Sequence, residues 1–201
     1  MKKLLLIILI ILLTGCYDYK ELNDIAIISG IGISKENDEY RVIYEVINTK
    51  ANKESNNDIK KYNVEAQDKN LSNAISKANE ALAKQPYFEQ IKVLLITKDV
   101  NILDISDYIF RNEKVNTSFY LALCDDIDEI FDYTSVNEPN NSIAIHNLLK
   151  EINYDKITNL FDFNVDNLMQ GYDIYLPYIT IDKELALKRL VFLIISLLKD
   201  I

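Results

Sequence analysis

The residue with the clearest chemistry in this sequence is Cys16, because its neighbours are those that bacteria place around a cysteine that will carry lipid. Cys16 closes the tetrapeptide Leu13-Thr14-Gly15-Cys16, which has the pattern of a bacterial lipobox. Small residues before the cysteine give a peptidase access to the bond it cleaves, and the thiol accepts a diacylglyceryl group. We therefore expect Cys16 to be acylated and to be the first residue of the mature chain.

The segment before Cys16 has the composition of a secretory leader. Lys2 and Lys3 form a short positive region, and every residue of Leu4–Leu13 is apolar. A helix of this length rises about 1.5 Å per residue and spans only about half of a hydrocarbon core of about 30 Å, which is typical of a signal peptide and not of a membrane-spanning helix. The alternative is an ordinary secretory signal before an unmodified cysteine. We predict a lipoprotein signal peptide over residues 1–15 and a protein that two or three acyl chains hold on the outer face of a membrane.

The other residues that could support catalysis lack the partners that catalysis requires. Cys124 ends an apolar segment with no basic residue close in sequence, which predicts a buried, unreactive thiol. His146 is the single histidine, and it lies in no Ser-His-Asp or Cys-His pattern and near no nucleophile elbow. Gly30-Ile31-Gly32 lacks the third glycine and the following helix of a dinucleotide-binding loop. We therefore predict no catalytic residue and no enzyme activity.

Metal and cofactor sites are not indicated either. One histidine and two cysteines are too few for a zinc site of the usual four-ligand kind. The acidic cluster Asp125-Asp126-Ile127-Asp128-Glu129 lacks the length and the glycine of an EF-hand loop. Acidic residues favour the first turn of a helix, and we interpret the cluster in that way. We expect neither a metal nor a cofactor.

The charge balance excludes one class of partner. The chain of 201 residues has 31 acidic and 22 basic residues, with a net charge of -9. Binding of nucleic acid depends on a basic surface, so we predict no nucleic-acid partner. Electrostatic docking on anionic lipid is disfavoured for the same reason, which leaves the lipid on Cys16 as the expected link to the membrane.

The hydrophobic pattern beyond residue 24 alternates between strands and helices. The predicted strands are residues 25–33, 40–48, 60–66, 91–97 and 118–124, with a short extended piece at 176–181. The predicted helices begin at residues 70, 102, 125, 140 and 157 and end near residues 82, 110, 131, 149 and 169. Gly30 and Gly32 within an apolar strand indicate a bulge or a close approach of another backbone. This order predicts an α+β fold with a mixed β-sheet of four to five strands and flanking helices.

Several weak motifs occur in an order that resembles one known family. Cys16 is followed at once by Tyr17-Asp18-Tyr19-Lys20-Glu21-Leu22-Asn23, and a strand with Gly30-Ile31-Gly32 comes next. Later the chain carries Gln90-Ile91-Lys92-Val93-Leu94-Leu95-Ile96 and a helix that closes on Arg111-Asn112. Residues 1–182 resemble the Ger(x)C family of spore germination lipoproteins, the C subunits of germinant receptors.

The sequence departs from this family at a few places. Tyr17 stands where the family usually has tryptophan, and Glu89-Gln90 stand where Gly-His is common. The family usually has about twice this length, and residues 183–201 do not resemble it. We therefore expect a Ger(x)C-like N-terminal domain over residues 16–182 and a divergent or truncated tail over residues 183–201.

The resemblance implies a lipid-anchored, non-enzymatic subunit of a spore germinant receptor, on the outer face of the spore inner membrane. It implies integral membrane subunits of that receptor as partners and a part in receptor assembly and nutrient-triggered germination. Tyr17, Asp18 and Glu21 then become candidates for docking onto those partners, beside the lipid on Cys16. The alternative from another class is a lipid-anchored solute-binding protein of a transporter.

Overall fold

A computed structural model of the protein describes residues 24–48, 61–111, 115–133, 138, 140–151, 159–168, 174–182 and 184–193. The strands of this part are β1 (Ile25–Glu36), β2 (Glu39–Ile47), β3 (Lys61–Asp68), β4 (Gln85–Tyr87), β5 (Val93–Ile96), β6 (Tyr120–Leu123), β7 (Ile174–Asp182) and β8 (Glu184–Leu193). Its helices are α2 (Leu71–Ala81), α3 (Ile102–Phe110), α4 (Ile127–Asp132), α5 (Asn141–Glu151) and α6 (Leu160–Leu168). None of these helices is long and apolar enough to cross a membrane.

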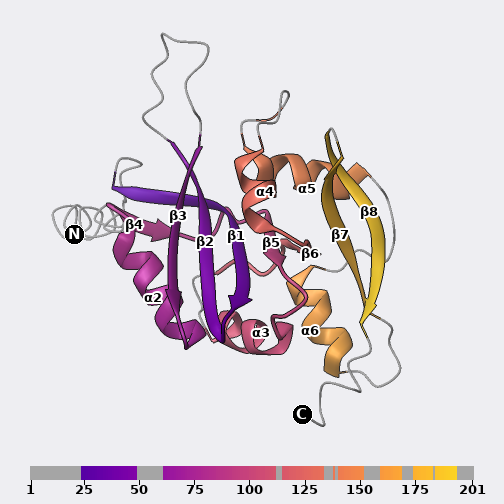
Figure 1. Ribbon diagram of the computed structural model, residues 1–201, viewed down its shortest axis with the longest axis horizontal. Helices are drawn as coiled ribbons and strands as arrows, with labels where there is room; N and C mark the ends of the chain where they lie inside the picture. Colours follow the sequence, from indigo (N-terminus) through magenta and orange to yellow (C-terminus); the bar gives the residue numbers. More distant parts are fainter. Residues whose placement is uncertain are drawn as a thin grey trace, which may run out of the picture.

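The strands form one mixed sheet in the order β3-β2-β1-β5-β6-β7-β8, with β4 paired to the start of β1 (Figure 1). The outer pairs are antiparallel, whereas β1, β5, β6 and β7 run parallel in the middle. The predicted α+β class with a mixed sheet is therefore confirmed. The sheet is larger than expected, because it has eight strands and not four to five.

The β1–β2 hairpin follows from the polar residues between the two strands. Asn37 and Asp38 have φ angles of 50° and 62°. Two central residues with positive φ are what a tight turn between twisted antiparallel strands requires, and Asn and Asp tolerate this conformation better than most residues. The turn sets the register in which Ile33 lies opposite Val42.

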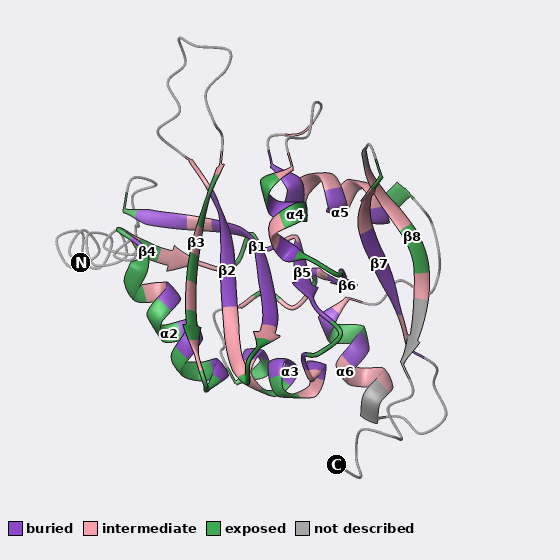
Figure 2. Cartoon of the chain, viewed as in Figure 1, coloured by how far each residue is buried: buried purple, intermediate pink, exposed green. Residues whose placement is uncertain are grey.

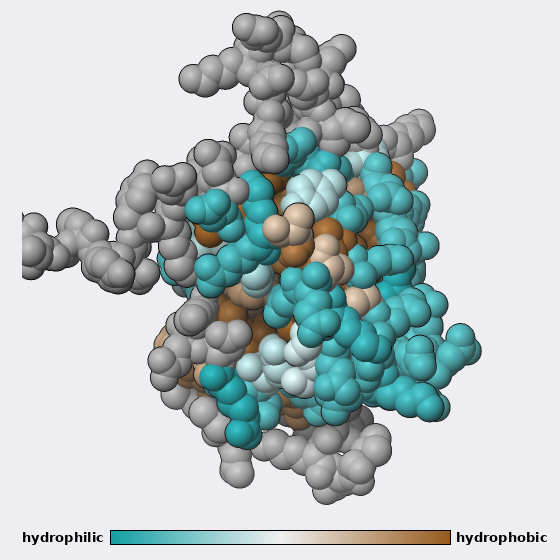
Figure 3. Space-filling view, turned by 90° about the vertical axis from the view of Figure 1, so that its left-hand side faces the viewer, coloured by the Kyte–Doolittle hydropathy of each residue, from teal (hydrophilic) through white to brown (hydrophobic). Residues whose placement is uncertain are grey.

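Helices cover both faces of the sheet, because its central strands are apolar on both sides (Figure 2). On one face, α2, α3 and α6 pack against side chains such as Tyr44 and Leu94. On the other face, α4 and α5 pack against side chains such as Ile43 and Leu95. Neighbouring residues of one strand thus enter opposite layers of the core. On the face that Figure 3 shows, hydrophilic residues dominate the described outer surface, and hydrophobic residues are visible between them.

The helix starts are close to those expected. Asn70 is the N-cap of α2, where its side chain accepts a hydrogen bond from Ser72 N at 2.9 Å, and Asp68 accepts one from Asn70 N. Within the acidic cluster, Asp126 caps α4 by accepting hydrogen bonds from Asp128 N and Glu129 N. The interpretation of that cluster as the first turn of a helix is confirmed.

The sheet exceeds the expected size through β4, beside the start of β1, and through β7 and β8 at one end. Three residues of β4 were too few to give a periodic pattern, and β7 begins two residues before the predicted extended piece. Within the expected divergent tail, residues 184–193 form β8, which pairs antiparallel with β7 from Asp182↔Glu184 to Ile174↔Leu193. The last part of the described chain is therefore held in the sheet.

Candidate functional site

The residues predicted to carry lipid and to dock, which are Cys16, Tyr17, Asp18 and Glu21, lie outside the described residues. The described chain starts at Asp24, whose carbonyl oxygen accepts a hydrogen bond from Gln85 N at 3.1 Å. Ile25 follows directly and begins β1. β1 is an interior strand that pairs with β2, β4 and β5. The segment expected to hold the membrane anchor therefore leads into the middle of the sheet.

Gly30 and Gly32 of β1 let two helices of the opposite layer approach the strand closely. A Cβ atom on Gly30 would lie 1.9 Å from Ser142 Oγ of α5. A Cβ atom on Gly32 would lie 2.4 Å from Ile127 Cγ2 of α4. The register of β1 against β2 also shifts between Ile28 and Gly30. The expected bulge is confirmed at Gly30. The groups that approach the two glycines closely are side chains of α4 and α5, whereas the alternative expectation was another backbone.

The bulge places Ser29 beside a carboxylate that is buried in the same layer. Gly30 pairs with Glu45 of β2, and both Ser29 and Glu45 have no exposed surface. Ser29 Oγ lies 3.0 Å from the carbonyl oxygen of Glu45 and 3.2 Å from its Oε2, so the hydroxyl donates toward both. A β-bulge commonly redirects a side chain in this manner.

The Glu45 carboxylate caps the N-terminus of α5, which lies far along the chain. Oε1 accepts a hydrogen bond from Asn141 N at 3.0 Å, and Oε2 accepts one from Ser142 N at 2.9 Å. The next two backbone N–H groups, those of Ile143 and Ala144, donate to the side chain and the carbonyl of Asn140. The bond from Ala144 N is the first of the helix itself, so the three preceding N–H groups are all bonded by side chains, and the negative charge of Glu45 lies at the positive end of the helix dipole.

Lys61, the first residue of β3, supplies the opposite charge. Its Nζ lies 3.2 Å from Glu45 Oε1 and also donates to the carbonyl oxygens of Phe131 and Tyr133 at the end of α4. Asn141 Nδ2 donates to the same two carbonyl groups and to that of Ile130. We call Ser29, Glu45, Lys61, Asn141 and Ser142 the polar node. The node joins β1, β2 and β3 to the end of α4 and the start of α5.

A second ion pair fixes the start of α4 to the same strands. Arg41 of β2 bonds Asp128 through Nη1 and Nη2, the Nη2 to Oδ1 distance being 2.9 Å. Its Nε donates to Glu65 of β3 at 2.9 Å. The bonds to Asp128 hold the pKa of Arg41 above its usual value, against the effect of partial burial. A guanidinium can bind two carboxylates in this way because it offers five donors in one plane.

The polar node stabilises the packing of the helices on the sheet and is not arranged to bind a substrate. Both oxygens of Glu45 accept two hydrogen bonds each, so the carboxylate has little capacity left for a substrate.

Cys124 is buried, its thiol donates toward the Ile96 carbonyl, and burial raises its pKa to about 12, which agrees with the predicted unreactive thiol. No group of three His, Cys, Asp or Glu side chains in the described ranges could hold a metal.

The polar node was not predicted from the sequence, although the sequence contains one signal for it. In β2 the residues of one face are Tyr40, Val42, Tyr44 and Val46, and those of the other are Arg41, Ile43, Glu45 and Ile47. Glu45 therefore stands between Ile43 and Ile47, in a part of this face that is otherwise apolar. A charged residue at such a position needs a partner, but neither Lys61 nor α5 can be found from its spacing.

Comparisons with known proteins extend the sequence resemblance. The family model described as "Spore germination protein N-terminal domain" matches residues 18–181. Spore germination protein KC of Bacillus subtilis (strain 168) is 27% identical over 124 residues, a match that covers 57% of this chain and 30% of that protein. The match thus spans less than a third of the length of this relative. No solved structure matches the chain.

Proposed function

The chain belongs to the Ger(x)C family of spore germination proteins. From this premise we propose that it is a lipid-anchored, non-enzymatic subunit of a spore germinant receptor. The match of the family model over residues 18–181 is the observation that carries the proposal. In this role the chain contributes to receptor assembly and to nutrient-triggered germination. Its partners are the integral membrane subunits of the receptor.

The proposed anchor is the lipid on Cys16, after removal of residues 1–15. Each buried methylene contributes about 0.8 kcal/mol to membrane binding, so two or three chains hold a protein firmly where one holds it only marginally. A domain confined to the outer face of the spore inner membrane meets its partners at a high effective concentration. Residues 16–182 are then the family domain, and residues 183–201 are a tail that diverges in sequence.

The structure supports a path from the anchor to the rest of the domain. The chain that follows the proposed docking residues Tyr17, Asp18 and Glu21 enters β1. β1 in turn contacts α4 and α5 through Gly30 and Gly32. A displacement of β1 would therefore act directly on two helices that pack against one face of the sheet. This supports a role in signal coupling between receptor subunits.

The transporter alternative finds no support in the described part of the chain. A solute-binding protein of that class has two lobes with a ligand cleft between them. Here the described strands form one sheet, and its helices lie on the two faces. We therefore retain the receptor-subunit proposal alone.

The decisive experiment removes the anchor and leaves the domain intact. The variant Cys16→Ala is produced in spores of a strain without other receptors of this kind. These spores should show no labelling of the chain by palmitate, and their nutrient-triggered germination rate should fall at least tenfold. Cys124→Ala is the matched control, because it removes the other thiol of the sequence and should leave both readouts close to wild type. Unchanged germination with every nutrient, in a strain that lacks the gene, would contradict the proposal.

Docking is tested separately from anchoring. Asp18→Ala combined with Glu21→Ala should reduce co-purification of the integral membrane subunits while palmitate labelling persists. Asp24→Ala is the control, since this exposed acidic residue lies close in sequence but contributes a carbonyl group, not its side chain, to the bond with Gln85. Equal co-purification of both variants would remove Asp18 and Glu21 from the proposed interface.

A further inference from the structure

The main path of the β-sheet ends at β3 on one side and at β8 on the other, so in the described part of the chain each of these strands has one neighbour. An edge strand presents backbone N–H and C=O groups that can pair with a further strand. Proteins commonly protect such edges with bulges, charges or short strands. The two edges differ in this protection, which indicates where a further strand would bind.

The edge at β8 is protected. Its register against β7 shifts between Tyr178 and Ile179, so that Lys188 is an extra residue of β8. Lys188 and Arg189 are both exposed at this point, and both cations lie within 6 Å of the centre of the Tyr178 ring, at 5.6 and 5.0 Å. A bulge beside two adjacent cations is unsuited to a regular ladder with another strand.

The edge at β3 has no such interruption. The whole strand pairs with β2 without a register shift, and it contains neither glycine nor proline. Each of its charged side chains has a partner of opposite charge within the chain, the pairs being Lys61 with Glu45, Glu65 with Arg41 and Asp68 with Lys77. These charges are therefore largely neutralised before a second strand approaches.

Three apolar side chains of β3 point to the face of the sheet that α2 covers. Val64 and Ala66 pack partly against the core of that face. Tyr62 lies on the same side of the strand but is 43% exposed, which places it among the few large hydrophobic side chains at the described surface. A tyrosine ring gains much of its binding energy from burial of its apolar body. A strand added at this edge would cover it.

The sequence of β3 fits a second copy of itself in one antiparallel register. Two identical strands pair around a two-fold axis, and residues directly opposite each other lie on the same face. With Val64 opposite Val64, Tyr62 lies opposite Ala66 and Asn63 lies opposite Glu65, so a large side chain meets a small one. The other register of equal length on matching faces would place Glu65 opposite Glu65, and like charges in that position are destabilising.

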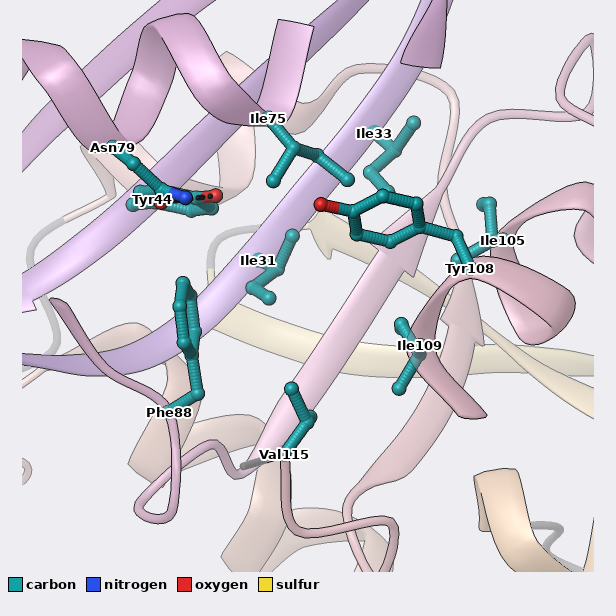
Figure 4. Close-up of a pocket in the computed structure, with 10 residues that line it drawn as sticks. All are labelled: Ile31, Ile33, Tyr44, Ile75, Asn79, Phe88, Ile105, Tyr108, Ile109 and Val115. Atoms are coloured by element: carbon teal, nitrogen blue, oxygen red, sulfur yellow. Dashed lines mark hydrogen bonds between the residues drawn. The ribbon is translucent and has the colours of Figure 1, made fainter. Parts of the chain in front are cut away.

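Helix α2 would meet its counterpart in such a pair. It packs on both β2 and β3, and Figure 4 shows Asn79 of this helix beside Tyr44 of β2, to which it is hydrogen-bonded. Neighbouring strands are about 4.8 Å apart, so the axes of two helices that each lie between β2 and β3 would be roughly 10 Å apart. Packed helices are separated by about 8–10 Å. The helices would therefore extend the contact between the strands.

The side of α2 that faces the edge carries complementary charges. Lys77 points toward β3, since its Nζ lies 2.7 Å from the carboxylate at the end of that strand, and Glu80 follows one turn later. Tyr44 lies opposite Val64 in the sheet and bonds Asn79 of α2. Asn79 is therefore near the level of the two-fold axis. In an antiparallel helix pair, Lys77 of each copy then faces Glu80 of the other.

We propose that the chain forms a homodimer through β3, in which two β3 strands pair antiparallel with Val64 opposite Val64 and the two α2 helices pack beside them. The two sheets then become one continuous sheet. Confinement of both copies to a membrane would raise their effective concentration. The pairing itself follows from β3 and α2 and does not depend on the proposed function.

The test is disulfide cross-linking in membranes of cells that produce the full chain with the background substitution Cys124→Ala. In Val64→Cys the two new thiols lie directly opposite each other, with Cα atoms about 4.5–5.5 Å apart, a distance that a disulfide can span. Oxidation should give at least fivefold more covalent dimer than in the Cys124→Ala parent, which reports any background from Cys16.

Tyr62→Cys is the matched control on the same strand. The residue opposite Tyr62 is Ala66, so the two new thiols of this variant would lie roughly 13 Å apart along the strands and should not cross-link above background. Production of Tyr62→Cys together with Ala66→Cys should restore the covalent dimer. Circular dichroism of each purified variant checks its fold.

Charge variants at Asn63 test the register in a second way. Asn63 is exposed and lies opposite Glu65 of the other copy in the proposed register. In the Val64→Cys background, Asn63→Lys should raise the yield of covalent dimer and Asn63→Glu should lower it several-fold, because an attraction is added in one case and a repulsion in the other.

Three outcomes would overturn the proposal. Covalent dimer of Val64→Cys no more abundant than in the parent would mean that β3 does not meet a second β3. Equal cross-linking of Val64→Cys and Tyr62→Cys would refute the register. Cross-linking of Val64→Cys to a different protein in place of a second copy would show that the edge binds another partner, and the homodimer would be wrong.

Discussion

Oε1 of Glu45 lies 3.2 Å from Nζ of Lys61, although Glu45 has no exposed surface and Lys61 belongs to the edge strand β3. Lys61 pairs with Ile47 in the sheet register, so its side chain reaches Glu45 diagonally across the face. The same two groups bond both the start of α5 and the end of α4. This ion pair thus holds α4 and α5 against one face of the sheet.

Replacing Glu45 by glutamine should destabilise the protein severely. Glutamine keeps the shape but removes the charge that balances Lys61, and its amide group cannot accept from both Asn141 N and Ser142 N. Removing one partner of a buried ion pair costs about 3–5 kcal/mol, so we expect a loss of about this size in the free energy of unfolding. Urea unfolding of the purified full chain, followed by circular dichroism, measures it.

Glu65→Gln is the matched control for Glu45→Gln. The Glu65 side chain is 58% exposed, and it too accepts hydrogen bonds from a cationic side chain, Arg41. Exposed ion pairs contribute up to about 1 kcal/mol, so this variant should unfold close to the wild-type urea concentration. Similar losses for the two glutamine variants would show that burial of Glu45 has no special energetic consequence.

A methyl group on Gly30 should separate α5 from β1. In Gly30→Ala the new Cβ would lie 1.9 Å from Ser142 Oγ, a clash that requires movement of the helix. Overpacking of this kind costs about 1–3 kcal/mol. Thermal unfolding of the full chain should show the loss.

The double variant Gly30→Ala with Ser142→Gly tests whether this clash is the cause. Glycine at position 142 keeps the backbone N–H that donates to Glu45 and removes the side chain in the way. The double variant should therefore lose less stability than the sum of the two single variants, as expected for residues in direct contact. Additive losses would mean that Gly30 is needed for another reason, such as the bulge in β1.

The central part of this fold could be predicted from the sequence because its signals are local. The apolar strand before Gly30, the turn at Asn37 and Asp38, and the cap at Asn70 each depend on neighbouring residues. The strand β8 could not be predicted in the same way, since Leu185 and Leu187 acquire a partner only through pairing with β7. This is one reason why the expected number of strands was too low, and the shortness of β4 is another.

The same difference between local and long-range signals separates the lipobox from the polar node. The lipobox is a contiguous motif and can be read directly, although Cys16 and the docking residues lie outside the described part of the chain. The polar node joins Glu45 to Ser142, 97 positions apart in sequence. Long-range contacts of this kind leave no spacing in the sequence, so only the oddly placed charge of Glu45 could have indicated them.

Cys124 should be unreactive in the folded protein. Burial raises the pKa of its thiol to about 12, and the thiolate is the form that reacts. Iodoacetamide at pH 8 should therefore label Cys124 only as fast as the protein unfolds, and 6 M urea should make labelling rapid. Peptide mapping by mass spectrometry distinguishes the labelling of Cys124 from that of Cys16. Rapid labelling under native conditions would contradict the buried position of Cys124.

His146 should make the protein less stable as the pH falls below 6.5. Its ring packs on Tyr120 with centres 5.2 Å apart, and burial, together with the positive charges of Lys92 and Lys150, lowers its pKa below the usual 6.5. Between the two pKa values the unfolded chain binds more protons than the folded chain, so acidification favours unfolding in that range. Because this is the single histidine, one NMR titration in native buffer and one in urea give both pKa values directly. The variant His146→Gln should lose the part of the pH dependence that begins at 6.5, and a folded pKa at or above the unfolded one would refute the predicted direction.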